Sequence, residues 1–176
     1  MNLVEFDFRY DWAYLVLNAL KSGFEVLRKK SGDDLWFDGI WQNENAETIY
    51  GIAYVLSQAY ILGVVEDVNK MRVDKGKEKL SKLVCYSDDP QRLQNGVSRI
   101  SLINSLANYY KHHDEWAKWP SNSTTQTLTN VGIFESTEFP CCYATTLLWD
   151  KEDLENLENL LLIISKWRKY IISKYL

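Results

Sequence analysis

Residues 49–65, IYGIAYVLSQAYILGVV, decide the fold of this chain because they form its most apolar stretch. Only Ser57 and Gln58 are clearly polar within it. A membrane-spanning helix needs about 20 such residues and usually has basic flanks, whereas this stretch is shorter and has acidic neighbours. A helix that is apolar on nearly every side is typical of the centre of a helical bundle. The stretch therefore predicts a core helix over about 45–69.

Three other segments have the spacing of amphipathic helices, with apolar residues at steps of three and four over 8–27, 90–115 and 154–171. The first stripe consists of Phe8, Trp12, Leu15, Val16, Leu20, Phe24 and Leu27. We expect Ser31-Gly32 to end this helix. Asn45, Asp89 and Asp150 are the N-caps expected for the later ones. Weaker signals indicate short helices near 74–86 and 124–133, and residues 31–44 are expected to form a loop.

These patterns predict an all-α, single-domain bundle over residues 1–176, with four main helices, short helices and irregular connections. A chain of 176 residues is long enough for one sizeable core. Its net charge of -4 makes it a poor general ligand for nucleic-acid backbone. The first residues lack a signal-peptide pattern. Three cysteines, of which Cys141 and Cys142 are adjacent, favour reduced thiols. We therefore expect a cytoplasmic protein that binds neither membrane nor nucleic acid directly.

The sequence contains no pattern for metal or cofactor chemistry. Its two histidines, His112 and His113, are adjacent, so on a helix they point about 100° apart and do not converge on one metal ion. The glycine-rich phosphate loops, the dinucleotide fingerprint and the nucleophile elbow are absent from the sequence. We expect no metal, no cofactor and, in the leading interpretation, no catalytic residue.

One face of the helix predicted over 90–115 has an unusual composition. It carries Ser101, Asn104, Ser105, Asn108, Lys111 and His112, where a solvated face usually carries Glu and Lys. Serine and asparagine form helices poorly and gain most where their polar groups have fixed partners. Three interpretations stay open for this face: a polar seam bonded to neighbouring helices, a site centred on His112, or plain surface.

The Lys-His element late in this helix resembles the HEPN group of small all-α bacterial proteins, many of which are dimeric ribonucleases of toxin or defence systems. The resemblance implies that His112 acts as general base and that Lys111 stabilises the phosphate, with Asn108 near the polar position of the family signature. That signature also has an Arg shortly before the His. Here Arg99 and Arg92 lie further upstream than the signature requires.

Charge is unevenly distributed along the chain. Residues 31–69 contain seven acids and no Lys or Arg, and aromatic residues interrupt the acids at the start of this segment. Aromatic anchors beside uncompensated carboxylates suit docking to a basic protein. The candidate contact set is Asp33, Asp34, Trp36, Asp38, Trp41, Glu44 and Glu47. In the alternative interpretation, these aromatics cap the end of the bundle and the acids simply face water.

Small acidic proteins of this character resemble bacterial immunity proteins, which neutralise a toxin that is often a basic nuclease. The resemblance implies a non-catalytic, antitoxin-like protein with a basic protein partner. The HEPN-like ribonuclease, active or degenerate and with a homodimer as one form, is the alternative. Trp116 and Trp119 are expected to fold back over the bundle or to extend its binding surface.

Overall fold

The computed structural model describes residues 7–33, 39–93, 95–149 and 151–176, which form an all-α bundle. The four main helices are α1 (Phe8–Asp33), α2 (Gly39–Asp74), α4 (Arg99–His112) and α7 (Glu158–Tyr175). The shorter elements are α3 (Lys82–Ser87), α5 (Ser123–Asn130), α6 (Pro140–Leu148) and the 3-10 turns η1 (His113–Glu115) and η2 (Lys151–Asp153). The described residues contain no strand, only an isolated bridge between Arg92 and Ser98.

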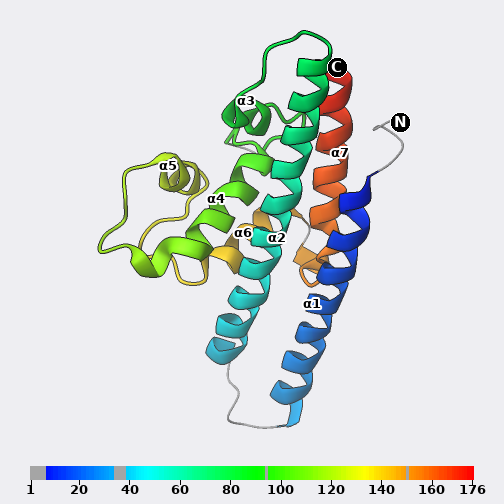
Figure 1. Cartoon of the computed structure of the whole chain (residues 1–176). Helices are drawn as coiled ribbons and strands as arrows, with labels where there is room; N and C mark the ends of the chain where they lie inside the picture. The colour runs from blue at the N-terminus through cyan, green and yellow to red at the C-terminus, as the bar shows by residue number, and fades with distance from the viewer. Residues whose placement is uncertain (1–6, 34–38, 94, 150) are drawn as a thin grey trace.

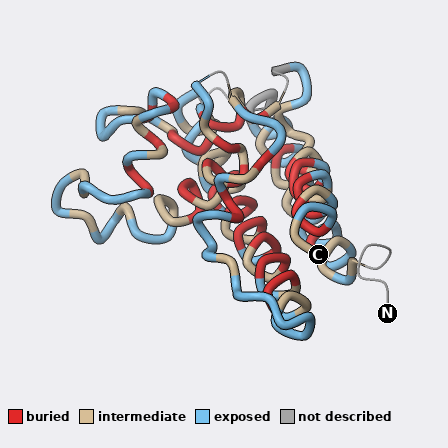
Figure 2. Tube along the Cα trace, turned by 90° about the horizontal axis from the view of Figure 1, so that it is seen from above, coloured by how far each residue is buried: buried red, intermediate tan, exposed pale blue. Residues whose placement is uncertain are grey.

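Helix α2 lies at the centre of the bundle and contacts α1, α3, α4, α6 and α7 (Figure 1). Its side chains at Tyr54, Tyr60, Ile61 and Val65 are fully buried. Seen from above, the buried residues line the sides on which the helices face one another (Figure 2). Among the described helices, α2 alone is long and apolar enough to cross a membrane, but the bundle buries 56% of its most apolar window. It has the burial of a core helix, as predicted.

The close approach of α2 and α4 depends on a residue without a side chain. A Cβ atom built on Gly51 would lie 2.0 Å from Cδ2 of the Tyr110 ring. The ring therefore packs directly on the backbone of α2, in space that any other residue would fill. This contact brings the C-terminal end of α4 against the N-terminal half of α2.

The outer helices are tied together by ion pairs across the core. Asp7, just before α1, accepts a hydrogen bond from the Tyr60 hydroxyl of α2 and lies 3.2 Å from Arg168 Nε of α7. Arg9 of α1 forms an ion pair with Asp67 of α2. The two ends of the described chain therefore meet through charged groups on three helices.

The predicted ends of the first two helices are wrong, and α2 also continues beyond Asn69 to Asp74. α1 continues through Ser31-Gly32 to Asp33, because serine and glycine each cost a helix only about 0.5–1 kcal/mol. α2 begins at Gly39, so residues 39–44 are helical and Asn45 lies inside the helix. The Asn45 side chain does not cap α2 but donates to the carbonyl oxygen of Trp41, at 2.7 Å.

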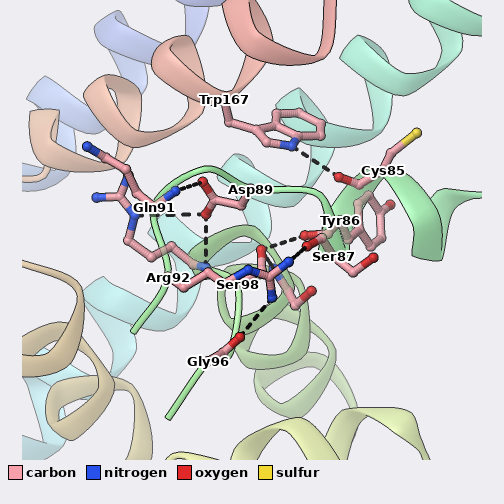
Figure 3. A network of polar contacts seen from close by, with 11 residues as sticks. Cys85, Tyr86, Ser87, Asp89, Gln91, Arg92, Gly96, Ser98 and Trp167 are labelled. Atoms are coloured by element: carbon pink, nitrogen blue, oxygen red, sulfur yellow. Dashed lines mark hydrogen bonds and ion pairs between the residues drawn. The ribbon is translucent and has the colours of Figure 1, made fainter. Parts of the chain in front are cut away.

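The start of α4 is also corrected, as Figure 3 shows. Ser98 is its N-cap and accepts from the Ser101 amide at 3.2 Å, so the helix begins nine residues later than Pro90. Asp89 instead organises the preceding loop: its two carboxylate oxygens accept from the amides of Gln91 and Arg99, at 2.9 and 3.1 Å. Both residues have the chemistry of a cap, and only the fold decides which one the helix uses.

The stripe predicted on α1 is partly wrong. Leu20, Phe24 and Leu27 pack against the core, but Phe8 and Leu15 are 60% and 68% exposed. Trp12 and Val16 are exposed as well. The inner face is instead centred on Ala13, Leu17 and Phe24. α1 carries apolar residues on two faces, and the sequence alone does not say which face the core takes.

The remaining helices also differ from the prediction, in where they begin and in their number. α3 begins after its N-cap Ser81 rather than at 74, and α7 begins at Glu158, beyond the 3-10 turn η2. α5 lies close to its predicted place. α6 was not predicted, although Pro140 occupies its first position, where proline is favoured.

Replacing Gly51 with alanine is expected to destabilise the protein by about 1–3 kcal/mol, because the new Cβ overlaps the Tyr110 ring and forces α2 and α4 apart. Chemical denaturation measures this change. The matched control is Gly39→Ala at the first residue of α2, where a Cβ meets no atom within 4 Å. An equal loss of stability in both variants would contradict the close packing at Gly51.

Candidate functional site

A cavity of about 460 Å³ lies where α4 meets α2 and the start of α6. We call it the α4 cavity. It is lined by Glu47, Thr48, Tyr109, Tyr110, His113, Asp114, Thr137, Phe139 and Pro140. The lining contains two carboxylates and four aromatic rings, counting histidine, and none of these residues is a lysine or arginine.

Glu47 joins α2 to α6. Its carboxylate oxygens accept hydrogen bonds from the backbone amides of Cys141 and Cys142, each at 2.8 Å. The first amides of a helix have no partner within the helix and carry a partial positive charge, so a carboxylate stabilises them. Burial, together with the nearby Glu47, raises the pKa of the Cys142 thiol. Glu47 therefore acts as a long-range cap and brings a negative charge to the cavity wall.

Phe139 separates the α4 cavity from a second hollow. Its backbone has a φ of 51°, in the left-handed region that bulky residues rarely occupy. The second hollow, which we call the α6 cavity, has a volume of about 350 Å³ and shares Phe139 in its wall. Its other lining residues are Asn43, Ala46, Tyr50, Glu138, Cys142, Tyr143, Thr146 and Leu154. Backbone strain of this kind persists only where the surroundings enforce it.

A cluster of aromatic rings forms the wall of the α4 cavity on the side of α4. The Tyr109 ring stacks on His113 with centroids 4.8 Å apart. Trp116 and Trp119 pack against Tyr109 at 5.8 and 6.2 Å, so both fold back onto α4, the first of the two predicted alternatives. Burial, together with the nearby Glu47, Cys141 and Asp114, raises the pKa of Tyr109 to about 12. The ring environment is therefore apolar and electrostatically negative.

The polar face of α4 is bonded to α2. The Gln58 amide nitrogen donates to the side-chain oxygens of Asn104 and Asn108, each at 2.8 Å, and Lys111 Nζ donates to Gln58 Oε1 at 2.7 Å. Asn108 also donates to Thr124 Oγ1, at 3.3 Å. This arrangement is the polar seam, the first of the three interpretations of this face. Lys111 and Asn108 are therefore engaged in the packing of helices.

His112 lies outside this seam. It is exposed, and its Nδ1 lies 3.3 Å from Glu115 Oε2. The arginines are used at the opposite end of α4: Arg92 donates to the carbonyl oxygens of Gly96 and Ser87 (Figure 3), and Arg99 lies 3.9 Å from Asp89. Within the described residues, the structure does not bring an arginine to His112. It is His113, not His112, that lines the α4 cavity.

The residues of the candidate contact set are distributed as follows. Asp34, Trp36 and Asp38 lie outside the described residues, and Asp33 is the last residue of α1. Trp41 is half-buried, with Lys30 Nζ at 5.8 Å from its ring. Glu44 is exposed one turn before Glu47, which caps α6. Glu44 and Glu47 thus lie on the face of α2 that borders the cavities.

Sequence analysis missed the residues that complete this face, namely His113, Asp114, Thr137, Glu138 and Phe139. The Phe139-Pro140 pair signals a helix start and could have placed α6. The pairing of Glu47 with that start has no local signal, because the two segments are 94 residues apart.

In the described part of the chain, no three or more His, Cys, Asp or Glu residues form a group that could hold a metal ion. The chain matches no protein-family model, and no curated protein or solved structure is significantly similar to it. The resemblances to the HEPN group and to immunity proteins therefore remain expectations.

Replacing Glu47 with glutamine is expected to lower the free energy of unfolding by about 1–2 kcal/mol, because an amide has one acceptor oxygen where the carboxylate offers two. Urea denaturation measures the loss. Glu44→Gln is the matched control, since it removes the same charge from an exposed position one turn away and should change stability by less than about 0.5 kcal/mol. Equal effects would contradict the capping role.

Proposed function

We propose that this protein is a non-catalytic binding protein, of immunity or antitoxin type, that neutralises a basic protein such as a nuclease toxin. One observation carries the proposal: two adjoining cavities on one face combine carboxylates with aromatic rings, and their linings contain no lysine or arginine. Aromatic residues supply contact area, and uncompensated carboxylates steer a basic partner toward it.

The proposed contact surface extends the candidate contact set. It comprises the first three turns of α2 with Trp41, Glu44 and Glu47, together with the cavity residues Asp114 and Glu138. Asp33, Asp34, Trp36 and Asp38 remain in the proposal because they connect α1 to the start of α2 in the chain. A cytoplasmic location is part of the proposal, and the free state of Cys85, Cys141 and Cys142 supports it.

The first test is co-purification of the tagged protein from its native cells, with partners and their stoichiometry determined by mass spectrometry. We expect one basic protein in near-equal amount. Recovery of the chain alone or as a homodimer, with RNA cleavage that His112→Ala abolishes, would overturn the proposal in favour of the HEPN-like ribonuclease.

A charge-reversal experiment tests the surface itself. The double variant Glu44→Lys/Glu138→Lys is expected to slow association with the basic partner by about ten-fold at low salt, because it replaces the steering carboxylates with repelling cations. Stopped-flow kinetics measure the rate, and the difference should shrink as ionic strength rises.

The matched control is Asp74→Lys/Glu78→Lys, which reverses two charges at exposed positions at and beyond the other end of α2. It should leave the association rate nearly unchanged. A similar slowing in the control and the double variant would mean that net charge, and not this surface, governs the encounter.

A further inference from the structure

The α4 cavity has the chemistry of a receptor for a planar organic cation. Its volume of about 460 Å³ exceeds the size of one amino-acid side chain. The Asp114 carboxylate is 93% exposed, and its Oδ1 lies 3.1 Å from His113 Nε2, which leaves Oδ2 accessible to a ligand. Each oxygen of Glu47 accepts one backbone amide, which leaves further acceptor capacity on the same carboxylate.

The aromatic wall distinguishes among cations. The His113 ring lies at 22° to the Tyr109 ring and at 30° to the Tyr110 ring, so it stacks on both tyrosines. A guanidinium group is flat, weakly hydrated and able to stack on such rings while it donates to carboxylates in its own plane. An ammonium group is a compact, strongly hydrated charge and gains less from this geometry.

The local electrostatics favour a cation. No lining residue is a lysine or arginine, and the nearest lysine in sequence, Lys111, donates to Gln58 in the seam between α2 and α4. Glu47 and Asp114 both act to raise the pKa of Tyr109, which shows that their negative potential reaches the aromatic wall. The α6 amides already contact Glu47, and His113 Nε2 lies 3.1 Å from Asp114 Oδ1, so a cation adds to these contacts whereas an anion is repelled by both carboxylates.

We infer that the α4 cavity binds the side chain of one arginine, held by Glu47 and Asp114 and stacked on the aromatic wall. As an anchor for an arginine of the partner, this inference rests on the proposed function. Binding of arginine itself is a property of the isolated chain and is tested separately.

The test is an NMR titration of the isolated protein with N-acetyl-arginine amide, alongside N-acetyl-lysine amide and the neutral N-acetyl-citrulline amide at equal ionic strength. We expect saturable shifts of backbone amides at residues 47–48, 109–114 and 137–139 with the arginine probe. Lysine should bind about five-fold more weakly or worse, and citrulline should give no saturable response. An equal response to arginine and citrulline, or no response to arginine, would overturn the inference.

Two pairs of variants place the site. Thr48→Lys puts an ammonium group beside Glu47 from an exposed position and should abolish the arginine response; Asn18→Lys adds the same charge on exposed α1 and should preserve it. Asp114→Asn should weaken arginine binding about five-fold. Glu115→Gln removes the neighbouring charge, which contacts His112 outside the cavity, and should have little effect. The inference fails if each variant behaves like its control.

Binding measurements with the basic partner test this inference and the proposed function separately. If Thr48→Lys and wild-type protein bind the basic partner equally while Glu44→Lys/Glu138→Lys weakens binding, the arginine anchor is wrong and the proposed function stands. If no basic partner exists but the isolated chain binds the arginine probe at this cavity, the site stands and the proposed function is wrong.

Discussion

The need to cover α2 on nearly every side constrains the whole structure. An apolar helix of this length loses its stabilising burial wherever a neighbour is missing, so α1, α4, α6 and α7 each take part of its surface. Where the Tyr110 ring of α4 packs on the backbone of α2, α2 has a glycine, Gly51. Where the buried amide of Gln58 faces α4, that helix supplies asparagines to bond it. The candidate surface lies where the N-terminal part of α2 meets α4 and α6, so the packing of these helices sets its shape.

The sequence predicts the elements that depend on composition and misses those that depend on distant contacts. The apolar run of α2 predicts a central helix. The Ser/Asn face of α4 allows three interpretations, and a polar seam is one of them. The boundaries fail where two residues offer the same chemistry, as Asp89 and Ser98 do at the start of α4. The inner face of α1 fails because that helix is apolar on two sides. In the candidate site, the charge pattern predicts Glu44 and Glu47 as contact residues. It does not predict that Glu47 binds the amides at the start of α6, because these lie far away in the chain.

Glu47 connects the start of α6 with the charge of the α4 cavity. One carboxylate caps the first amides of α6, next to Phe139, and supplies negative charge to the α4 cavity. Lys111 illustrates the opposite case, because a residue suited to bind phosphate is drawn into a bond with Gln58. Local motifs therefore describe the chemistry that is available, and packing decides where that chemistry faces.

The tie between Asp7 and Arg168 has a consequence for synthesis. The residues that α7 covers on α2 emerge from the ribosome long before α7 does, so a nascent chain carries an apolar, partly uncovered helical hairpin. Such surfaces attract other unfinished chains and the chaperones that shield them. This protein therefore reaches its native packing only after α7 emerges, and its yield in cells should depend on chaperone supply more than its size suggests.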